Sequence, residues 1–120
     1  MAENNLDYLC AKHGQDIKEG EETIIQKALG VLQEDGLFAF VVFLESKAGS
    51  TDNEVVGSML AKTAELLNEV GLTSDAKEEN IRAAILDITK EIDCMFLAKD
   101  LVERMLIYAR YHAKALAGKK

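Results

Sequence analysis

The sequence predicts an all-α protein, a compact bundle of five to six helices around a buried central apolar helix, in a single domain spanning residues 1–120. Three observations lead to this prediction. The 120 residues suit one domain, and they include no proline and only 8 glycines, as expected for helices joined by short turns. Apolar residues recur at helical spacing along most of the chain. One segment, Leu37–Leu44, is apolar without interruption.

The segment Leu37–Leu44 is the predicted centre of the bundle. Its periodicity alone fits either a buried strand or a buried helix. We interpret it as a helix because nothing else in the chain resembles a strand that could pair with it, and a lone strand would leave its backbone donors and acceptors unsatisfied. Since no face of this helix is polar, we expect other helices to cover it on all sides.

Two amphipathic helices are predicted before this centre. The first, Asn4–His13, carries a short apolar stripe that we expect Gly14 to end. The second, Glu21–Asp35, ends at Gly36, which we expect to adopt a left-handed cap. One face of this second helix collects its apolar residues, Ile24, Ile25, Ala28, Leu29 and Leu32.

A third amphipathic helix is predicted after the centre. Its composition marks Ala48–Asp52 as a loop. Asp52 or Asn53 can cap the helix that follows. That helix runs to about Val70, and Gly71 ends it.

The remaining chain predicts one shorter and one longer helix. Thr73–Asp75 offers an N-cap for a helix with an apolar stripe of Ile81, Ala84, Ile85 and Ile88. The sequence leaves open whether this helix stops near Thr89 or bends into the next. The last helix runs from about Ile92 to Leu116. Its polar arc holds Lys99, Asp100, Glu103, Arg104, Ile107, Arg110, Tyr111 and Lys114.

The charge is distributed unevenly along the chain. The formal net charge is −7, and it divides into −7 for residues 1–60, −4 for residues 61–102 and +4 for residues 103–120. A basic last helix on an acidic body predicts a polyanionic or acidic partner at one end. The alternative is that cations near a helix C-terminus only complement its dipole.

The sequence carries no recognisable catalytic signature. It has no phosphate-binding or dinucleotide glycine pattern and no Glu-x-x-His pair. Cys10 and His13 supply two of the four ligands of a structural zinc site and Cys94 could be a third, but the remaining spacing is not met. We interpret Cys10 as a small core residue, His13 as a helix-end histidine, and His112 as a core histidine. We therefore expect no enzyme, no cofactor, no metal and no small-molecule substrate.

The cysteine content predicts a reducing compartment. Two cysteines do not make a disulfide framework. No signal peptide and no apolar run near the roughly 20 residues that span a bilayer is present. We expect a soluble cytoplasmic protein that does not contact membranes.

The last helix carries a cationic stripe. Lys99, Arg104, Arg110 and Lys114 share its polar arc with Tyr111, and Lys119 and Lys120 could extend it. Such a stripe can bind the phosphates of a nucleic acid without reading bases. The alternative is a solvated helix face with i, i+4 ion pairs to nearby acids.

Two segments resemble a known family. Gly36–Lys47 begins with Gly-Leu and ends with Phe-Leu-x-x-Lys, and residues 109–115 read Ala-Arg-Tyr-His-Ala-Lys-Ala. Both are similar to helices of the small α-helical (Cmr-type) subunit of type III CRISPR effector complexes. The chain departs from that family in lacking a proline near Leu29 and in having His112 where phenylalanine is common.

This resemblance implies a non-catalytic protein that stacks head to tail with copies of itself and with other subunits of a ribonucleoprotein complex. It implies contact with the guide and target RNA backbone through Lys47, Arg104, Arg110 and Lys114. The alternative is a helical adaptor that grips an acidic protein partner through its basic helix without contacting nucleic acid.

Overall fold

The computed structural model describes residues 5–17, 22–47 and 53–118, and it confirms the all-α bundle. In the described part of the chain no strand is present. The predicted loop Ala48–Asp52, Lys119 and Lys120 lie outside the described residues. The elements are α1 (Leu6–Gln15), α2 (Glu22–Asp35), α3 (Leu37–Ser46), α4 (Asn53–Glu69), the 3₁₀-helix η2 (Glu78–Asn80), α5 (Ile81–Ile88) and α6 (Ile92–Gly118).

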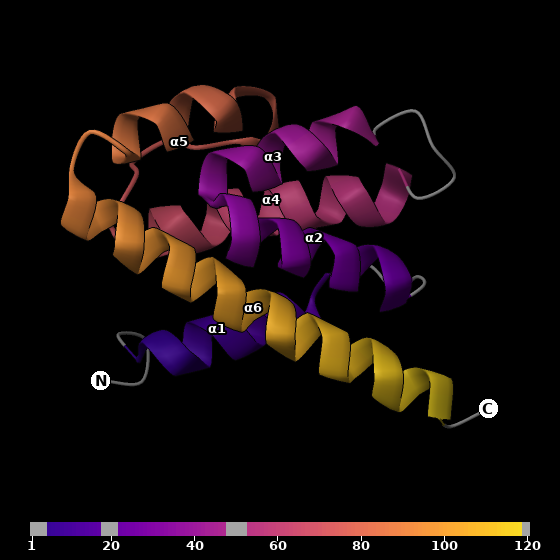
Figure 1. Ribbon diagram of the computed structural model, residues 1–120. Helices are drawn as coiled ribbons and strands as arrows, with labels where there is room; N and C mark the ends of the chain where they lie inside the picture. Colours follow the sequence, from indigo (N-terminus) through magenta and orange to yellow (C-terminus); the bar gives the residue numbers. More distant parts are fainter. Residues whose placement is uncertain (1–4, 18–21, 48–52, 119–120) are drawn as a thin grey trace.

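The helix α6 organises the bundle. It contacts every other α-helix of the described chain. Figure 1 shows α6 crossing the whole molecule, with α1 packed beneath it, the other helices above it, and α5 leading into its start. Its buried side includes Leu101, Val102, Met105 and Leu106, and its C-terminal turns reach beyond α1 (Figure 1).

The expectation that α3 is covered on all sides is wrong for one side. Leu37, Phe40, Val41 and Leu44 are buried, whereas Val42 is 38% exposed. A helix satisfies its own backbone hydrogen bonds. Exposing one side of α3 to solvent therefore loses only the stabilisation from burying a few side chains. The neighbours of α3, mainly α2 and α5, therefore need to pack on one flank only.

Gly14 does not end the first helix but lies within its last turn, buried against α6. A Cβ built on Gly14 would lie 2.6 Å from the Met105 carbonyl oxygen and 2.9 Å from Tyr108 Cβ. Only glycine allows the α1 and α6 backbones to approach this closely. The close approach also lets the buried Cys10 thiol donate to the Leu101 carbonyl oxygen at 3.4 Å.

The predicted glycine turns occur where expected. Gly36 has φ 99° and ψ 180°, a conformation open to glycine although not the left-handed helical one predicted. It lets the chain reverse, so that α3 runs back along α2 (Figure 1). Gly71, with φ 84°, follows the end of α4 as predicted.

The predicted N-cap at Thr73–Asp75 is wrong, because η2 starts only at Glu78. The intervening turn is held by Asn68 of α4 instead. Asn68 Oδ1 accepts from the Ala76 backbone N–H at 2.9 Å, and Asn68 Nδ2 donates to the Ala76 carbonyl oxygen at 2.8 Å. These bonds keep the turn from starting a helix earlier. The open question at Thr89 resolves into a break, since α5 ends at Ile88 and α6 begins at Ile92.

Candidate nucleic-acid interface

The cationic stripe predicted on α6 divides into two halves. In the first half, Arg104 lies between carboxylates, 3.6 Å from Asp100 Oδ2 and 3.9 Å from Asp7 Oδ1 of α1. The first contact is the i, i+4 pair that the alternative interpretation predicted. Lys99 lies half-buried one turn before Glu103. This half of the stripe is therefore close to neutral.

The second half of α6 carries Arg110, Tyr111 and Lys114. Lys114 is exposed, Tyr111 is 62% exposed and Arg110 is half-buried. Arg110 and Tyr111 line a shallow hollow between α6 and α2. The other side chains and backbone that line it belong to Gln26, Leu29, Gly30, Gln33 and Ile107.

Cations from other helices gather at the same end of the bundle. Figure 1 places the C-terminal end of α6, the end of α3 and the start of α2 at one end of the molecule. Lys47 follows α3, with its ammonium 5.6 Å from the Phe43 ring centroid. Lys27 is exposed on α2, next to the hollow-lining Gln26. We call Lys27, Lys47, Arg110 and Lys114 the basic end.

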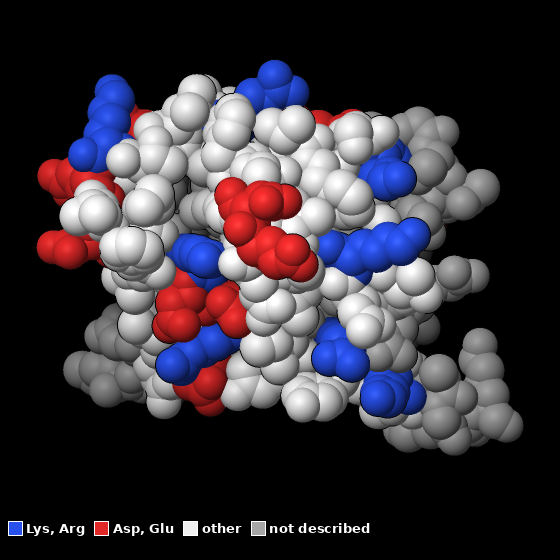
Figure 2. All heavy atoms as spheres, in the orientation of Figure 1, with Lys and Arg blue, Asp and Glu red and all other residues white. Residues whose placement is uncertain are grey.

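Figure 2 shows how the charges lie on this face. Blue spheres follow its right-hand side, over α2 and the ends of α3 and α6, whereas on the left blue and red spheres lie side by side and a further group of red spheres lies at the centre. Among the described residues the basic end therefore offers a local positive surface on a chain of net charge −7. A polyanion is attracted to such a surface because exposed charges act over about 10 Å at moderate salt.

Sequence analysis missed Lys27. It is one of four lysines among eleven acidic residues in residues 1–60, so the net charge of that segment hides it. The available signal was its position on the polar side of the second helix. That signal becomes useful only when α2 is known to pack beside α6.

The two histidines differ from each other in burial. His13 lies in the last turn of α1, as expected, but it is only 2% exposed, and its Nε2 pairs with Glu69 Oε1 of α4 at 2.8 Å. Its Nδ1 has no hydrogen-bond partner and lies 3.9 Å from Glu65 Oε1. His112, expected in the core, is half-buried, because it lies on the part of α6 that reaches beyond α1 (Figure 1).

The two cysteine thiols both have raised pKa values. Burial raises the pKa of the Cys10 thiol to about 11, which keeps this thiol protonated and unreactive. Cys94 donates to Glu91 Oε1 at 3.4 Å, and this bond raises the pKa of its thiol. Among the described residues no group of three His, Cys, Asp or Glu side chains is arranged to hold a metal ion.

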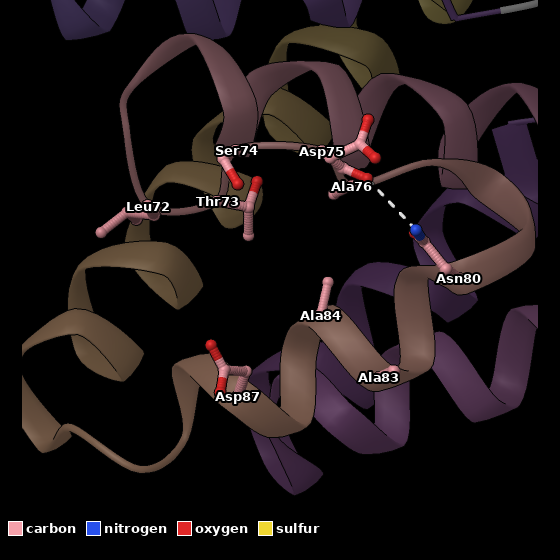
Figure 3. Close-up of a pocket in the computed structure, with 9 residues that line it drawn as sticks. All are labelled: Leu72, Thr73, Ser74, Asp75, Ala76, Asn80, Ala83, Ala84 and Asp87. Carbon is pink, nitrogen blue, oxygen red and sulfur yellow. Dashed lines mark hydrogen bonds between the residues drawn. The ribbon is translucent and has the colours of Figure 1, made fainter.

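A second hollow lies between the turn after α4 and α5. Figure 3 shows Thr73, Ser74 and Asp87 around its opening, with Ala84 between them and Asn80 donating to the Asp75 carbonyl oxygen at 3.1 Å. Its lining contains two carboxylates and no basic side chain. This hollow would repel phosphate and is no part of the interface.

Comparisons with protein-family models, with curated proteins and with solved structures found no match to this chain. Within the described residues, no helix is both long enough and apolar enough to cross a bilayer.

Proposed function

We propose that the protein is a non-catalytic helical subunit of a type III CRISPR ribonucleoprotein effector complex. In this role its basic end contacts the phosphates of the guide and target RNA, and its other surfaces contact neighbouring subunits and further copies of the chain. The contact is with the backbone, so it positions the RNA and carries no sequence preference of its own.

One observation carries this proposal. The two segments that resemble the Cmr-type small subunit, Gly36–Lys47 and residues 109–115, are far apart in the sequence, yet both run toward the right-hand side of the bundle in Figure 1, with the end of α3 above α2 and the end of α6 below it. Lys47 lies at the end of the first segment, and Arg110 and Lys114 lie in the second. An RNA strand that runs along this side would meet cations from both segments.

Arg104 and Lys99 have a smaller part in the proposed contact. The carboxylates of Asp100 and Asp7 beside Arg104 already occupy its guanidinium and would repel a phosphate. The proposed RNA contact therefore lies over the C-terminal half of α6, together with α2 and the end of α3.

A second function, a protein adaptor that does not bind nucleic acid, is favoured by a different surface. Large apolar side chains are exposed at the corner where α5 leads into α6: Leu86 is 50% exposed, Ile92 63% and Phe96 57%. Exposed apolar residues that lie close together suit a protein neighbour. The same corner would serve subunit contacts within a ribonucleoprotein, so its presence fits both functions.

Fluorescence anisotropy with a labelled single-stranded RNA tests the first function. We expect the full chain to bind RNA at low salt with an affinity that falls as salt rises. Arg110→Ala combined with Lys114→Ala should reduce the slope of log affinity against log salt by about 1.4, at about 0.7 for each lost phosphate contact. The matched control, Arg104→Ala, should leave the slope nearly unchanged.

Circular dichroism on both variants checks that helicity is retained. Equal RNA affinity and equal slopes for the wild type, the double variant and the control would remove the basic end as the site. Absence of RNA binding by the wild type at the lowest salt, together with capture of an acidic protein, would favour the adaptor.

A further inference from the structure

The hollow between α2 and α6 is the feature that phosphate contact leaves unexplained. Its walls come from two helices, and they combine an apolar floor with polar groups at the rim. Leu29 and Ile107 provide the apolar part, and Gln26, Gln33 and Arg110 provide the polar part. Tyr111, 62% exposed, stands at the α6 side.

Gly30 points to a binding role for this hollow. It lies in the interior of α2, where glycine costs about 1 kcal/mol relative to alanine. Nothing lies within 4 Å of a Cβ built on Gly30, so no packing contact requires glycine there. Gly14, in contrast, is required by a backbone contact. The missing Gly30 side chain instead leaves the hollow open along α2.

The polar groups of the hollow suit a flat ring with a hydrogen-bonding edge. Gln33 Nε2 donates to Glu103 Oε2 at 2.9 Å, and the carbonyl oxygen of the same amide is an acceptor. Gln26 is exposed and offers both an amide donor and an amide acceptor. The Tyr111 ring offers a stacking face, and the exposed ammonium of Lys114, three residues further along α6, offers donors for a phosphate attached to the ring's sugar.

We propose that this hollow takes one unstacked nucleobase of the RNA that the basic end contacts. The base would stack on Tyr111 over the space left by Gly30, with its polar edge toward Gln26 and Gln33. This inference rests on the proposed function, because it needs an RNA strand at the basic end. It adds to that function a contact with a base and a preference for single-stranded over fully paired RNA.

A nuclear magnetic resonance titration of the full chain, which has a mass of 13.2 kDa, tests the inference even if binding is weak. The two probes are a short uridine RNA and an abasic ribose-phosphate chain of the same length. We expect the uridine RNA to shift the side-chain amide signals of Gln26 and Gln33 and the backbone signal of Gly30. The abasic chain should shift signals of the basic end, including Arg110 and Lys114, and leave the side-chain amide signals of Gln26 and Gln33 unchanged.

The outcomes separate the two proposals. Equal shifts with both probes would overturn the base contact and leave the phosphate contact standing. No shift at the basic end with either probe would overturn the proposed function, and the base contact with it. Shifts in the hollow that need the base would support both.

Two variants sharpen this test. Tyr111→Ala should weaken binding of the uridine RNA by about 5- to 150-fold, the range of one lost base-stacking contact, and leave binding of the abasic chain unchanged. Tyr111→Phe keeps the ring and should bind like the wild type. Gly30→Ala places a methyl group in the space that the base would occupy, so it should weaken uridine RNA binding while leaving the fold intact. Full uridine RNA binding by both Tyr111→Ala and Gly30→Ala would contradict the inference.

Discussion

The substitutions Gly14→Ala and Gly30→Ala are expected to change the stability of the protein in opposite directions. Both glycines lie inside helices, so alanine should favour each helix by about 1 kcal/mol on intrinsic propensity alone. Their surroundings differ. A Cβ on Gly14 meets the Met105 carbonyl oxygen at 2.6 Å and Tyr108 Cβ at 2.9 Å, whereas a Cβ on Gly30 meets nothing within 4 Å.

The magnitudes follow from these contacts. At Gly14 the clash involves backbone, which cannot rotate away, so α1 must move off α6. Overpacking of this kind costs typically 1–3 kcal/mol, and displacement of α1 also exposes part of Leu9, which is 3% exposed in the native state. After the gain in helix propensity we expect a net loss of about 1–2 kcal/mol. At Gly30 we expect a net gain of about 0.5–1 kcal/mol.

Urea unfolding followed by far-ultraviolet circular dichroism measures both effects. With a slope of about 1.5 kcal/mol per molar urea, Gly14→Ala should lower the unfolding midpoint by about 1 M and Gly30→Ala should raise it by about 0.5 M. The wild type and both variants are compared at the same protein concentration. Midpoint shifts of the same sign for the two variants would refute the close packing of α1 on α6 as the reason for Gly14.

Three further predictions concern the core, the turn after α4 and the thiols. Phe40→Ala should destabilise the fold by about 3–5 kcal/mol because Phe40 is fully buried, whereas Val42→Ala, at a position 38% exposed, should cost less than about 1 kcal/mol. Equal losses of stability for the two variants in thermal unfolding would contradict the one-sided burial of α3. Asn68→Ala should cost about 2 kcal/mol, because two backbone groups of the following turn lose their partner; an unchanged urea midpoint would show that the turn holds without it. At neutral pH a disulfide reagent should modify half-exposed Cys94 in the native protein and Cys10 only on unfolding. The reason is that burial raises the pKa of the Cys10 thiol to about 11. Rapid modification of Cys10 in the folded state would contradict its burial.

The fold class follows from the sequence because helical periodicity is local. The apolar stripe of α2 indicates a helix from neighbouring residues alone, whereas the uninterrupted segment of α3 could be assigned only because the rest of the chain offers no strand to pair with it. Two properties of the packing do not follow in this way. The role of Gly14 depends on how closely α6 approaches, and the exposure of Val42 depends on how far α2 and α5 extend around α3.

The candidate site follows from the sequence only in part. The helical wheel places Arg104, Arg110 and Lys114 on one polar arc, and the structure keeps them on the surface. The helical wheel cannot show that Asp7, in a helix almost a hundred residues earlier, reaches Arg104 and neutralises it. It also cannot bring Lys27 to the same end as Arg110, since that depends on α2 packing beside α6.

The histidines illustrate the same limit. His112 lies in the middle of the apolar arc of α6, so the wheel predicts burial. The helical wheel does not show which part of α6 extends beyond α1. In that C-terminal part of α6, His112 is only half-buried. His13 is buried because α4 brings Glu69 to within 2.8 Å of its Nε2, a contact between distant segments.

Purification of the native protein from the cells that produce it, with nuclease treatment before analysis of the bound material, tests the central claim most directly. We expect short RNA, protected from the nuclease, to copurify with the protein and with other protein subunits, and to be lost when Arg110 and Lys114 are both replaced by alanine. Recovery of protein partners with no protected RNA would contradict an RNA-contacting role for the basic end.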